Sequence, residues 1–288
     1  LIEAGLFFRF DATNILKENL ASVITSISKD HLDWLPKNEQ TVEKIVFEKT
    51  STLLNSNIII AKQNSIKTID CIKKTILQNP SNKVFFNEHF SYSVNENDFF
   101  YYEDKIGGLK LPMPNVLGQF QLENISTAIA TLRTLDLNLK DENIQKGIRK
   151  ISSLARLQEI KSGKFKDLVK NNLLLLDGSH NEDGARVLNE YLQTLDCRKH
   201  VILGMMANKD HEKYISYFKD ISSLTTVDIP NQPNAISGKK LKEKFKKFPN
   251  VQYKESIQQA IKSISLKESD LLIITGSLYL GGEFLNLN

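Results

Sequence analysis

The sequence predicts an α/β protein of two domains, the second of them a doubly wound parallel sheet. At 288 residues, the chain is long enough for about two hydrophobic cores. In its second half, short apolar runs alternate with helical patterns, an order typical of parallel sheets with helices on both faces. The periodicity lapses over Lys146–Leu154, which marks the predicted linker. We therefore predict domains at residues 1–150 and 151–288.

The predicted second domain contains four short apolar strands, each ending near polar or glycine residues. They are expected at Leu173–Leu176, His200–Leu203, Leu224–Ile229 and Leu271–Thr275, with a helix at Asp183–Leu195. Ligands bind beyond the carboxyl ends of such strands. Asp177–Asn181 lies between the first strand and the helix, so we predict a ligand site there. Asn181 is expected to cap the helix.

The predicted first domain mixes helices with short strands. Apolar residues at helical or strand spacing identify these elements. The expected helices cover Val42–Leu54, Ser65–Gln78 and Asn124–Leu137; the expected strands are the tail Leu1–Ile2, Ser22–Ser28, Asn57–Ala61 and a β-rich region over Lys83–Val94 and Asp98–Leu111 with a turn at Ile106–Gly108.

Composition argues against several classes of protein. The net charge is only +4, and the basic run Lys239–Lys247 is interpreted as a solvated helix face, so no nucleic-acid partner is expected. No apolar run approaches the ~20 residues of a membrane-spanning helix, and no signal peptide is recognisable. Cys71 and Cys197 lie far apart and indicate reduced thiols, which favours a cytoplasmic protein without a membrane partner.

Two predicted strand ends in the first domain carry side chains that can bind a metal ion. Glu3 is the first charge after Leu1–Ile2, and Asp30 and His31 follow the strand at Ser22–Ser28. A carboxylate suits Mg²⁺, whereas imidazole is a less usual ligand and must be neutral. Spacing alone leaves open that Glu3 is a solvated carboxylate and His31 merely precedes a helix.

Several short motifs follow one another along almost the whole chain. They lie at Glu3–Leu6, Arg9–Asn14, Thr25–Ile27, Asp30–His31, Glu48–Lys49, Asp177–Asn181 and Thr275–Leu280. In this order they resemble folylpolyglutamate synthase/dihydrofolate synthase, a family of Mur-ligase-like ATP-dependent amide-forming enzymes. The resemblance implies a P-loop-type central ATPase domain at 1–150, with its P-loop part missing. It implies a Rossmann-like C-terminal glutamate-ligase domain at 151–288.

The resemblance also implies a reaction and its cofactors. The enzyme would add L-glutamate to dihydropteroate or a folate through an acyl phosphate, using ATP and Mg²⁺, as a monomer. Glu3 and His31 would hold Mg²⁺, and carbamylated Lys49 would supply an oxygen to a second metal ion. Lys49 and His31 are therefore the catalytic candidates. Carbamylation requires a neutral amine, which desolvation favours.

The same resemblance implies four residues that bind ATP. Asn124 would contact the adenine, although from the residues alone it is equally a helix cap. Arg156 would contact the phosphates, for which a planar guanidinium is suited. Asp177 and His180 would hold the ribose and adenine side.

The sequence departs from the family pattern in places. Phe7–Phe8 replaces Gly-Gly, Thr50–Thr52 replaces Ala-Gly-Ile, and Ser153–Ala155 replaces Trp-Pro-Gly. No G-x-x-x-x-G-K-[ST] loop occurs, and the first residue is leucine. We therefore expect an N-terminally truncated chain without ligase turnover of its own. A Mur-type cell-wall amino-acid ligase and a catalytically inactive nucleotide-binding module remain alternatives.

Overall fold

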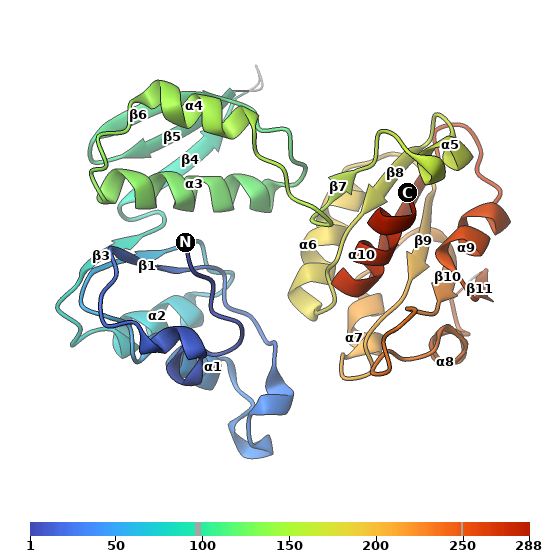
Figure 1. The fold of residues 1–288 in the computed structure, drawn as a ribbon, viewed down its shortest axis with the longest axis horizontal. Helices are drawn as coiled ribbons and strands as arrows, with labels where there is room; N and C mark the ends of the chain where they lie inside the picture. Colours follow the sequence, from blue (N-terminus) through green and yellow to red (C-terminus); the bar gives the residue numbers. More distant parts are fainter. Residues whose placement is uncertain (96–98, 249) are drawn as a thin grey trace. The chain divides into compact units, whose positions relative to one another are not determined.

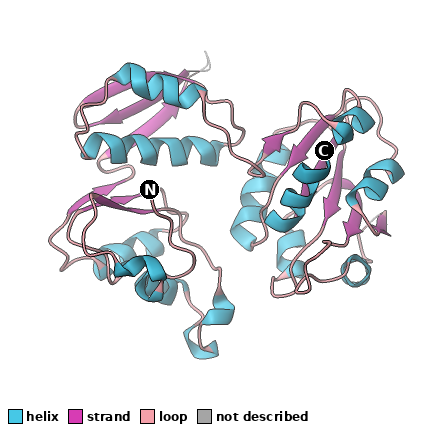
Figure 2. Ribbon diagram, viewed as in Figure 1, coloured by secondary structure: helices cyan, strands magenta, loops and turns pink. Residues whose placement is uncertain are grey.

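The computed structural model describes residues 1–95, 99–248 and 250–288 and contains two compact units (Figure 1). Unit 1 consists of Leu1–Asn115 and Gln119–Ile151, and unit 2 of Val116–Gly118 and Ser152–Asn288. Both units mix helices and sheets (Figure 2), as the α/β prediction requires. Among the described residues, no helix is long and apolar enough to cross a membrane.

A three-stranded parallel sheet with two helices forms one part of unit 1. The sheet has the order β1 (Ala21–Ile24), β2 (Asn57–Ile60) and β3 (Asn82–Phe85), and the connecting helices are α1 (Val42–Thr50) and α2 (Ile66–Thr75). The core contains fully buried isoleucines from these elements, among them Ile45, Ile58 and Ile72. Four short 3₁₀ helices lie in the loops: η1 (Phe8–Phe10), η2 (Ala12–Ile15), η3 (Leu32–Trp34) and η4 (Lys37–Glu39).

An antiparallel meander with two helices forms the rest of unit 1. Its strands are β4 (Phe90–Val94), β5 (Phe99–Asp104) and β6 (Gly107–Pro112), followed by α3 (Gln119–Thr134) and α4 (Asp141–Arg149). Asp104 Oδ1 accepts hydrogen bonds from the backbone N–H groups of Ile106 and Gly107, which closes the predicted turn between β5 and β6. The expected strand start at Asp98 lies outside the described residues.

Unit 2 is a six-stranded sheet with the order β11-β10-β9-β12-β8-β7. The strands β8 (Leu173–Leu176), β9 (Lys199–Leu203), β10 (Ile221–Val227), β11 (Val251–Lys254) and β12 (Leu271–Thr275) are parallel, and β7 (Gln158–Glu159) is antiparallel. The helices are α5 (Lys164–Val169), α6 (Glu182–Gln193), α7 (His211–Ser216), α8 (Gly238–Lys244), α9 (Ile257–Ser263) and α10 (Leu278–Leu287). The predicted doubly wound sheet is confirmed.

Side chains that alternate along the strands of unit 2 build its core. Leu174 and Leu176 of β8 pack in one buried cluster with Phe165 of α5, Ile261 of α9 and Phe284 of α10. Leu175 is equally buried but belongs to the opposite pleat, because successive side chains point to opposite faces. Leucines on both pleats of β8 therefore require cover on both faces of the sheet.

Three expectations for local structure were wrong. Leu1 and Ile2 are exposed coil rather than the end of a strand, since two apolar residues without a paired neighbour cannot hold a ladder. Lys146–Arg149 is helical because Ile144 and Ile148, four residues apart, bury one face of α4. Helix α3 begins at Gln119, so Asn124 lies inside it and does not cap it.

Candidate functional site

In unit 1, Lys49 lies in a partly buried position at the end of α1. Its Nζ donates a hydrogen bond to Leu6 O at 3.1 Å and lies 5.9 Å from the centroid of the Phe7 ring. Burial lowers the pKa of Lys49 below its usual value, and the charge of Asp30 opposes part of that shift. The environment therefore favours the neutral amine that carbamylation needs.

His31 packs against the same aromatic ring. The His31 and Phe7 rings meet edge to face with their centroids 6.3 Å apart. His31 has a left-handed backbone with φ of 57°, and its Nε2 lies 3.9 Å from Asp30 Oδ2. The structure thus brings His31 and Lys49 to the Phe7 ring from two separate segments of the chain, and Asp30 lies close to His31.

The Phe7–Phe8 segment takes a shape that suits phenylalanine. Phe7 has an extended backbone with φ of −104° and is only 7% exposed, within the core of unit 1. Phe8 begins η1, and neither residue has a positive φ. The glycine conformations for which Phe would be unsuited are therefore not needed in this loop.

Asp11 organises the loop that carries Glu3. Its Oδ2 accepts hydrogen bonds from the backbone N–H of Gly5 at 2.9 Å and of Leu6 at 3.3 Å, and its Oδ1 accepts from Thr13 N and Oγ1. The bonds from Thr13 contribute most to lowering the pKa of Asp11 to about 2. Asp11 therefore caps η2, because its side chain accepts the bond from Thr13 N.

The side chains of unit 1 suit only a metal site with few protein ligands, in which water and substrate oxygens complete the shell. Glu3 lies in exposed coil, and no group of three or more His, Cys, Asp or Glu side chains among the described residues can hold a metal ion. Mg²⁺ commonly takes one or two protein ligands and completes its shell with water and phosphate oxygens. A carboxylate and a neutral imidazole, the side-chain types of Glu3 and His31, are chemically able to be such ligands.

In unit 2, Asp177 occupies the end of β8, as the sequence predicts. It is 6% exposed, and its two carboxylate oxygens accept hydrogen bonds from backbone N–H groups on two segments. Oδ2 lies 2.7 Å from Leu157 N, and Oδ1 lies 2.9 Å from Ser179 N. Asp177 therefore ties the strand end to the segment that carries Arg156.

The residues that flank Arg156 have unusual backbone conformations. Ala155 and Leu157 have φ of 50° and 51°, and both are buried, whereas Arg156 between them is exposed. Ala155 O accepts a hydrogen bond from Gly178 N at 2.7 Å. The arginine side chain is consequently presented at the surface, beside the strand end.

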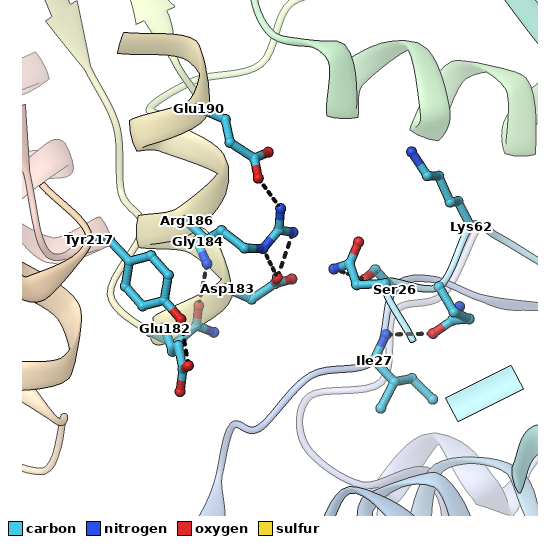
Figure 3. Close-up of polar contacts among 12 residues, drawn as sticks. Ser26, Ile27, Lys62, Glu182, Asp183, Gly184, Arg186, Glu190 and Tyr217 are labelled. Carbon is cyan, nitrogen blue, oxygen red and sulfur yellow. Dashed lines mark hydrogen bonds and ion pairs between the residues drawn. The ribbon is translucent and has the colours of Figure 1, made fainter. Parts of the chain in front are cut away.

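His180 and Asn181 link this strand end to α6. His180 Nδ1 lies 3.0 Å from Gly178 O, and Asn181 Oδ1 accepts a hydrogen bond from Gly184 N at 2.9 Å, so the predicted cap is confirmed. Figure 3 shows the polar contacts of the first turns of this helix, including Tyr217 with Glu182 and Arg186 with Asp183. In unit 1, the same figure shows the N–H of Ile27, which donates to the buried side chain of Gln63 at 2.9 Å.

A buried hydroxyl network at the strand ends of unit 2 was not predicted from the sequence. Tyr214 OH lies 2.7 Å from Thr275 Oγ1 and 3.0 Å from Ser179 Oγ, and burial raises the pKa of Tyr214. Ser179 and Thr275 stand at the ends of β8 and β12, which is a sequence signal for such a network. Tyr214 comes from α7 and carries no such signal.

Asn124 is exposed on α3 in unit 1, and Arg156, Asp177 and His180 gather at one edge of unit 2. The structure therefore brings together the predicted residues of unit 2 and, in unit 1, Lys49 and His31; among the described residues it shows no contact that joins Glu3 or Asn124 to them. In unit 1 the group near Phe7 contains Lys49 and His31.

Comparisons with known proteins find relatives that cover nearly the whole chain. Residues 163–278 match the family "Mur ligase, glutamate ligase domain". The chain is 27% identical to a dihydrofolate synthase/folylpolyglutamate synthase of Haemophilus influenzae over 99% of this chain and 67% of that protein. For the Bacillus subtilis protein of the same name, identity is 25% over 97% of this chain and 65% of that protein.

Solved structures resemble the chain over nearly its whole length. Escherichia coli FolC in complex with DHPP and ADP has a TM-score of 0.82 and 25% identity, over 98% of this chain and 64% of that chain. The Yersinia pestis bifunctional enzyme complexed with AMPPNP and Mn ion has a TM-score of 0.80 and, at 24% identity, supports the fold. The chain thus spans about two thirds of the length of these relatives.

The second α/β unit, which holds the polar strand-end site, carries the match to the Mur ligase glutamate ligase domain. Over nearly its whole length, the chain is similar to folylpolyglutamate synthase/dihydrofolate synthases.

Proposed function

We propose that this chain is part of an ATP-dependent ligase that joins L-glutamate to dihydropteroate or a folate. The main support is the similarity over 98% of the chain to Escherichia coli FolC in complex with DHPP and ADP, with a TM-score of 0.82. The partial burial of Lys49, which lowers its pKa below the usual value, supports the same reaction, because it suits a lysine that is carbamylated. The proposal includes a cytoplasmic location and a monomeric state.

Unit 1 would contribute the metal-binding and catalytic groups. Glu3 and His31 would hold Mg²⁺ as two protein ligands, and the carbamate of Lys49 would supply an anionic oxygen to a second ion. Bound Mg²⁺ would neutralise negative charge on the phosphate oxygens during phosphoryl transfer. His31 must keep Nε2 or Nδ1 unprotonated for this role. Its edge contact with Phe7 restricts the orientation of its ring.

The ATP-binding residues are assigned as the family resemblance implies. We assign Asn124 of α3 to the adenine, Arg156 of unit 2 to the phosphates, and His180 of unit 2 to the ribose and adenine side. Asp177 lies at the same strand end, where its carboxylate binds backbone N–H groups. The exposed Arg156 is suited to phosphate, because a guanidinium offers several donors in one plane.

The proposed reaction consists of two successive substitutions, the first at phosphorus and the second at carbon. A carboxylate oxygen of the acceptor attacks the γ-phosphorus of ATP, and ADP leaves, which produces an acyl phosphate. The amine nitrogen of glutamate then attacks the acyl carbon, phosphate leaves, and the nitrogen loses a proton. The protein contributes positions and fixed charges, which stabilise the charge that develops in each step.

The test is phosphate release from Mg-ATP by the protein expressed from its complete open reading frame. We expect release that requires both L-glutamate and one acceptor, dihydropteroate or tetrahydrofolate, and that falls at least about 100-fold in Lys49→Ala. The exposed Lys29→Arg variant is the matched control and should keep wild-type rates. Release with a UDP-muramoyl acceptor alone would favour the cell-wall branch. A folded protein without acceptor-dependent release would contradict the proposal.

A second expectation concerns the 288-residue chain itself. It contains no G-x-x-x-x-G-K-[ST] phosphate loop, so we expect no turnover from it alone. Steady glutamate-dependent ATP hydrolysis by this chain would contradict that expectation.

A further inference from the structure

We propose that Asp177 is a positioning residue that holds the Arg156 segment in place through the backbone. This assignment rests on the proposed contact of Arg156 with the phosphates of ATP. It differs from a direct contact between Asp177 and the ribose, because the partners of the carboxylate in the structure are protein N–H groups.

The first support is the hydrogen bonding of the carboxylate. Asp177 Oδ2 accepts from Leu157 N at 2.7 Å, and Oδ1 accepts from Ser179 N at 2.9 Å. Asp177 and Leu157 are 6% and 1% exposed, so the bond between them is shielded from water. Hydrogen bonds to a charged acceptor are stronger than neutral ones, and a buried N–H left without its acceptor is costly.

The second support is the backbone that this bond stabilises. Ala155 and Leu157 both have φ near +50°, which is unfavourable for residues other than glycine, asparagine and aspartate. Such residues persist where the surroundings hold them. The surroundings here are the bonds Leu157 N–Asp177 Oδ2, Gly178 N–Ala155 O and Ala155 N–Gln158 Oε1, at 2.7, 2.7 and 2.9 Å.

The geometry therefore connects one carboxylate to one exposed arginine. The buried side chains of Ala155 and Leu157 anchor the segment on both sides of Arg156. Loss of the bond from Leu157 N would let the segment relax to an ordinary backbone conformation. The direction of the Arg156 side chain would change with it, while β8 and the rest of the sheet keep their pairing.

Hydrogen exchange tests the positioning without any ligand. In the 288-residue chain, we expect the Leu157 amide to exchange at least about tenfold faster in Asp177→Asn than in the wild type. Asp228→Asn is the matched control: Asp228 also follows a strand of unit 2 and accepts from Gly238 N at 2.7 Å and Tyr253 OH at 2.5 Å, away from Arg156. Unchanged protection of Leu157 in a folded Asp177→Asn variant would overturn the proposal.

Nucleotide binding tests whether Asp177 acts through Arg156. The dissociation constant for Mg-ADP is measured in the wild type, Asp177→Asn, Arg156→Ala and the double variant of the complete protein. We expect Asp177→Asn to weaken binding at least about fivefold in the wild type and less than about twofold when Arg156 is already alanine. Equal weakening in both backgrounds would mean a direct contact and would overturn the proposal.

A second substitution, Ala155→Gly, tests whether the backbone conformation is what Asp177 maintains. Glycine adopts positive φ readily, so Ala155→Gly should restore part of the affinity that Asp177→Asn loses, and it provides a second variant if Asp177→Asn folds poorly. Absence of any recovery would count against positioning. A wild-type protein that does not bind Mg-ADP would remove the proposed function at this site, whereas the exchange result would still decide the role of Asp177 in the backbone.

Discussion

Arg9 and Glu48 form a two-point ion pair between η1 and α1. Arg9 Nε lies 2.7 Å from Glu48 Oε2, and Arg9 Nη2 lies 3.0 Å from Oε1. The Glu48 side chain is only 4% exposed, and Lys44 Nζ lies 3.2 Å from its Oε1. The pair holds the end of α1 against η1. Lys49, the proposed carbamate, is the next residue of this helix end.

Replacing the carboxylate tests this ion pair. Burial alone would raise the pKa of Glu48, but the bonds from Arg9 and Lys44 outweigh it and lower the pKa. We expect Glu48→Gln to reduce the free energy of unfolding by about 1.5–3 kcal/mol at pH 7. The exposed Glu18→Gln is the control and should stay within about 0.5 kcal/mol. Urea unfolding followed by circular dichroism measures both; equal stabilities would refute the role of the pair.

Because His200 is buried, we expect unit 2 to lose stability in mild acid. Its Nδ1 lies 2.7 Å from Ser223 Oγ, and its Nε2 lies 3.3 Å from Asp270 Oδ2. Burial lowers the pKa of His200 below its usual 6.5, and Asp270 opposes part of this shift, while the charge of Arg198 adds to it. The unfolded chain therefore binds the proton more tightly, so stability is complete above pH 6.5 and falls as the pH drops below it.

Hydrogen exchange of β9 and β12 peptides between pH 5 and 7.5 measures this effect, after correction for the intrinsic exchange rates. We expect the protection of wild-type peptides to fall toward pH 5 and the pH dependence to be smaller in His200→Gln. His211, whose pKa burial also lowers, supplies the remaining slope. The same pH dependence in both proteins would show that His200 does not titrate as we infer.

Lys49 is expected to take up CO₂. The neutral amine nitrogen attacks the carbon of CO₂ and loses a proton, which produces an anionic carbamate. Because burial lowers the pKa of Lys49, the carbamylated fraction should rise with pH at lower values than for an exposed lysine. Carbon NMR with labelled bicarbonate should show a carbamate signal in the wild type and in Lys29→Arg. A signal that persists in Lys49→Arg would assign the carbamate to another amine.

The hydroxyl network of Tyr214 should stabilise unit 2. Removing its OH takes away the hydrogen bonds that it shares with the hydroxyls of Ser179 and Thr275, in a site where Tyr214 is fully buried. We expect Tyr214→Phe to lower the free energy of unfolding by about 1–2 kcal/mol. Tyr279→Phe, at a side chain that is 56% exposed, should change it by less than about 0.5 kcal/mol. Thermal unfolding compares the two variants, and similar midpoints would argue against the network.

Much of unit 2 was predictable from local pattern. The runs at Leu173–Leu176 and Leu271–Thr275 are β8 and β12 to the residue. Their leucine and isoleucine side chains are buried on both faces, which gives a continuous apolar run. The edge strand β11 was missed because Val251–Lys254 is half-buried throughout and has no such run. The two-residue strand β7 is defined only by its pairing with β8.

The candidate site was predictable in its residue types and less so in its contacts. Asp177 was identified from its place after a strand, and Asn181 from its place before a helix. The hydrogen-bond partners of Asp177 could not be predicted, because Leu157 N lies twenty positions away along the chain. No periodicity of apolar residues encodes which backbone N–H a carboxylate will reach.

The sequence by itself determined most of the strand runs of unit 2, the cap at Asn181, and the placement of polar residues at strand ends. These depend on interactions within a few residues. The tertiary structure alone decided that Phe7 is buried, that Lys49 is desolvated beside it, and that Arg9 pairs with Glu48. The contacts of Lys49 and Arg9 join residues 43 and 39 positions apart, so they form only when the chain packs. Desolvation and long-range pairing, which set the pKa of Lys49 and Glu48, are therefore properties of the fold.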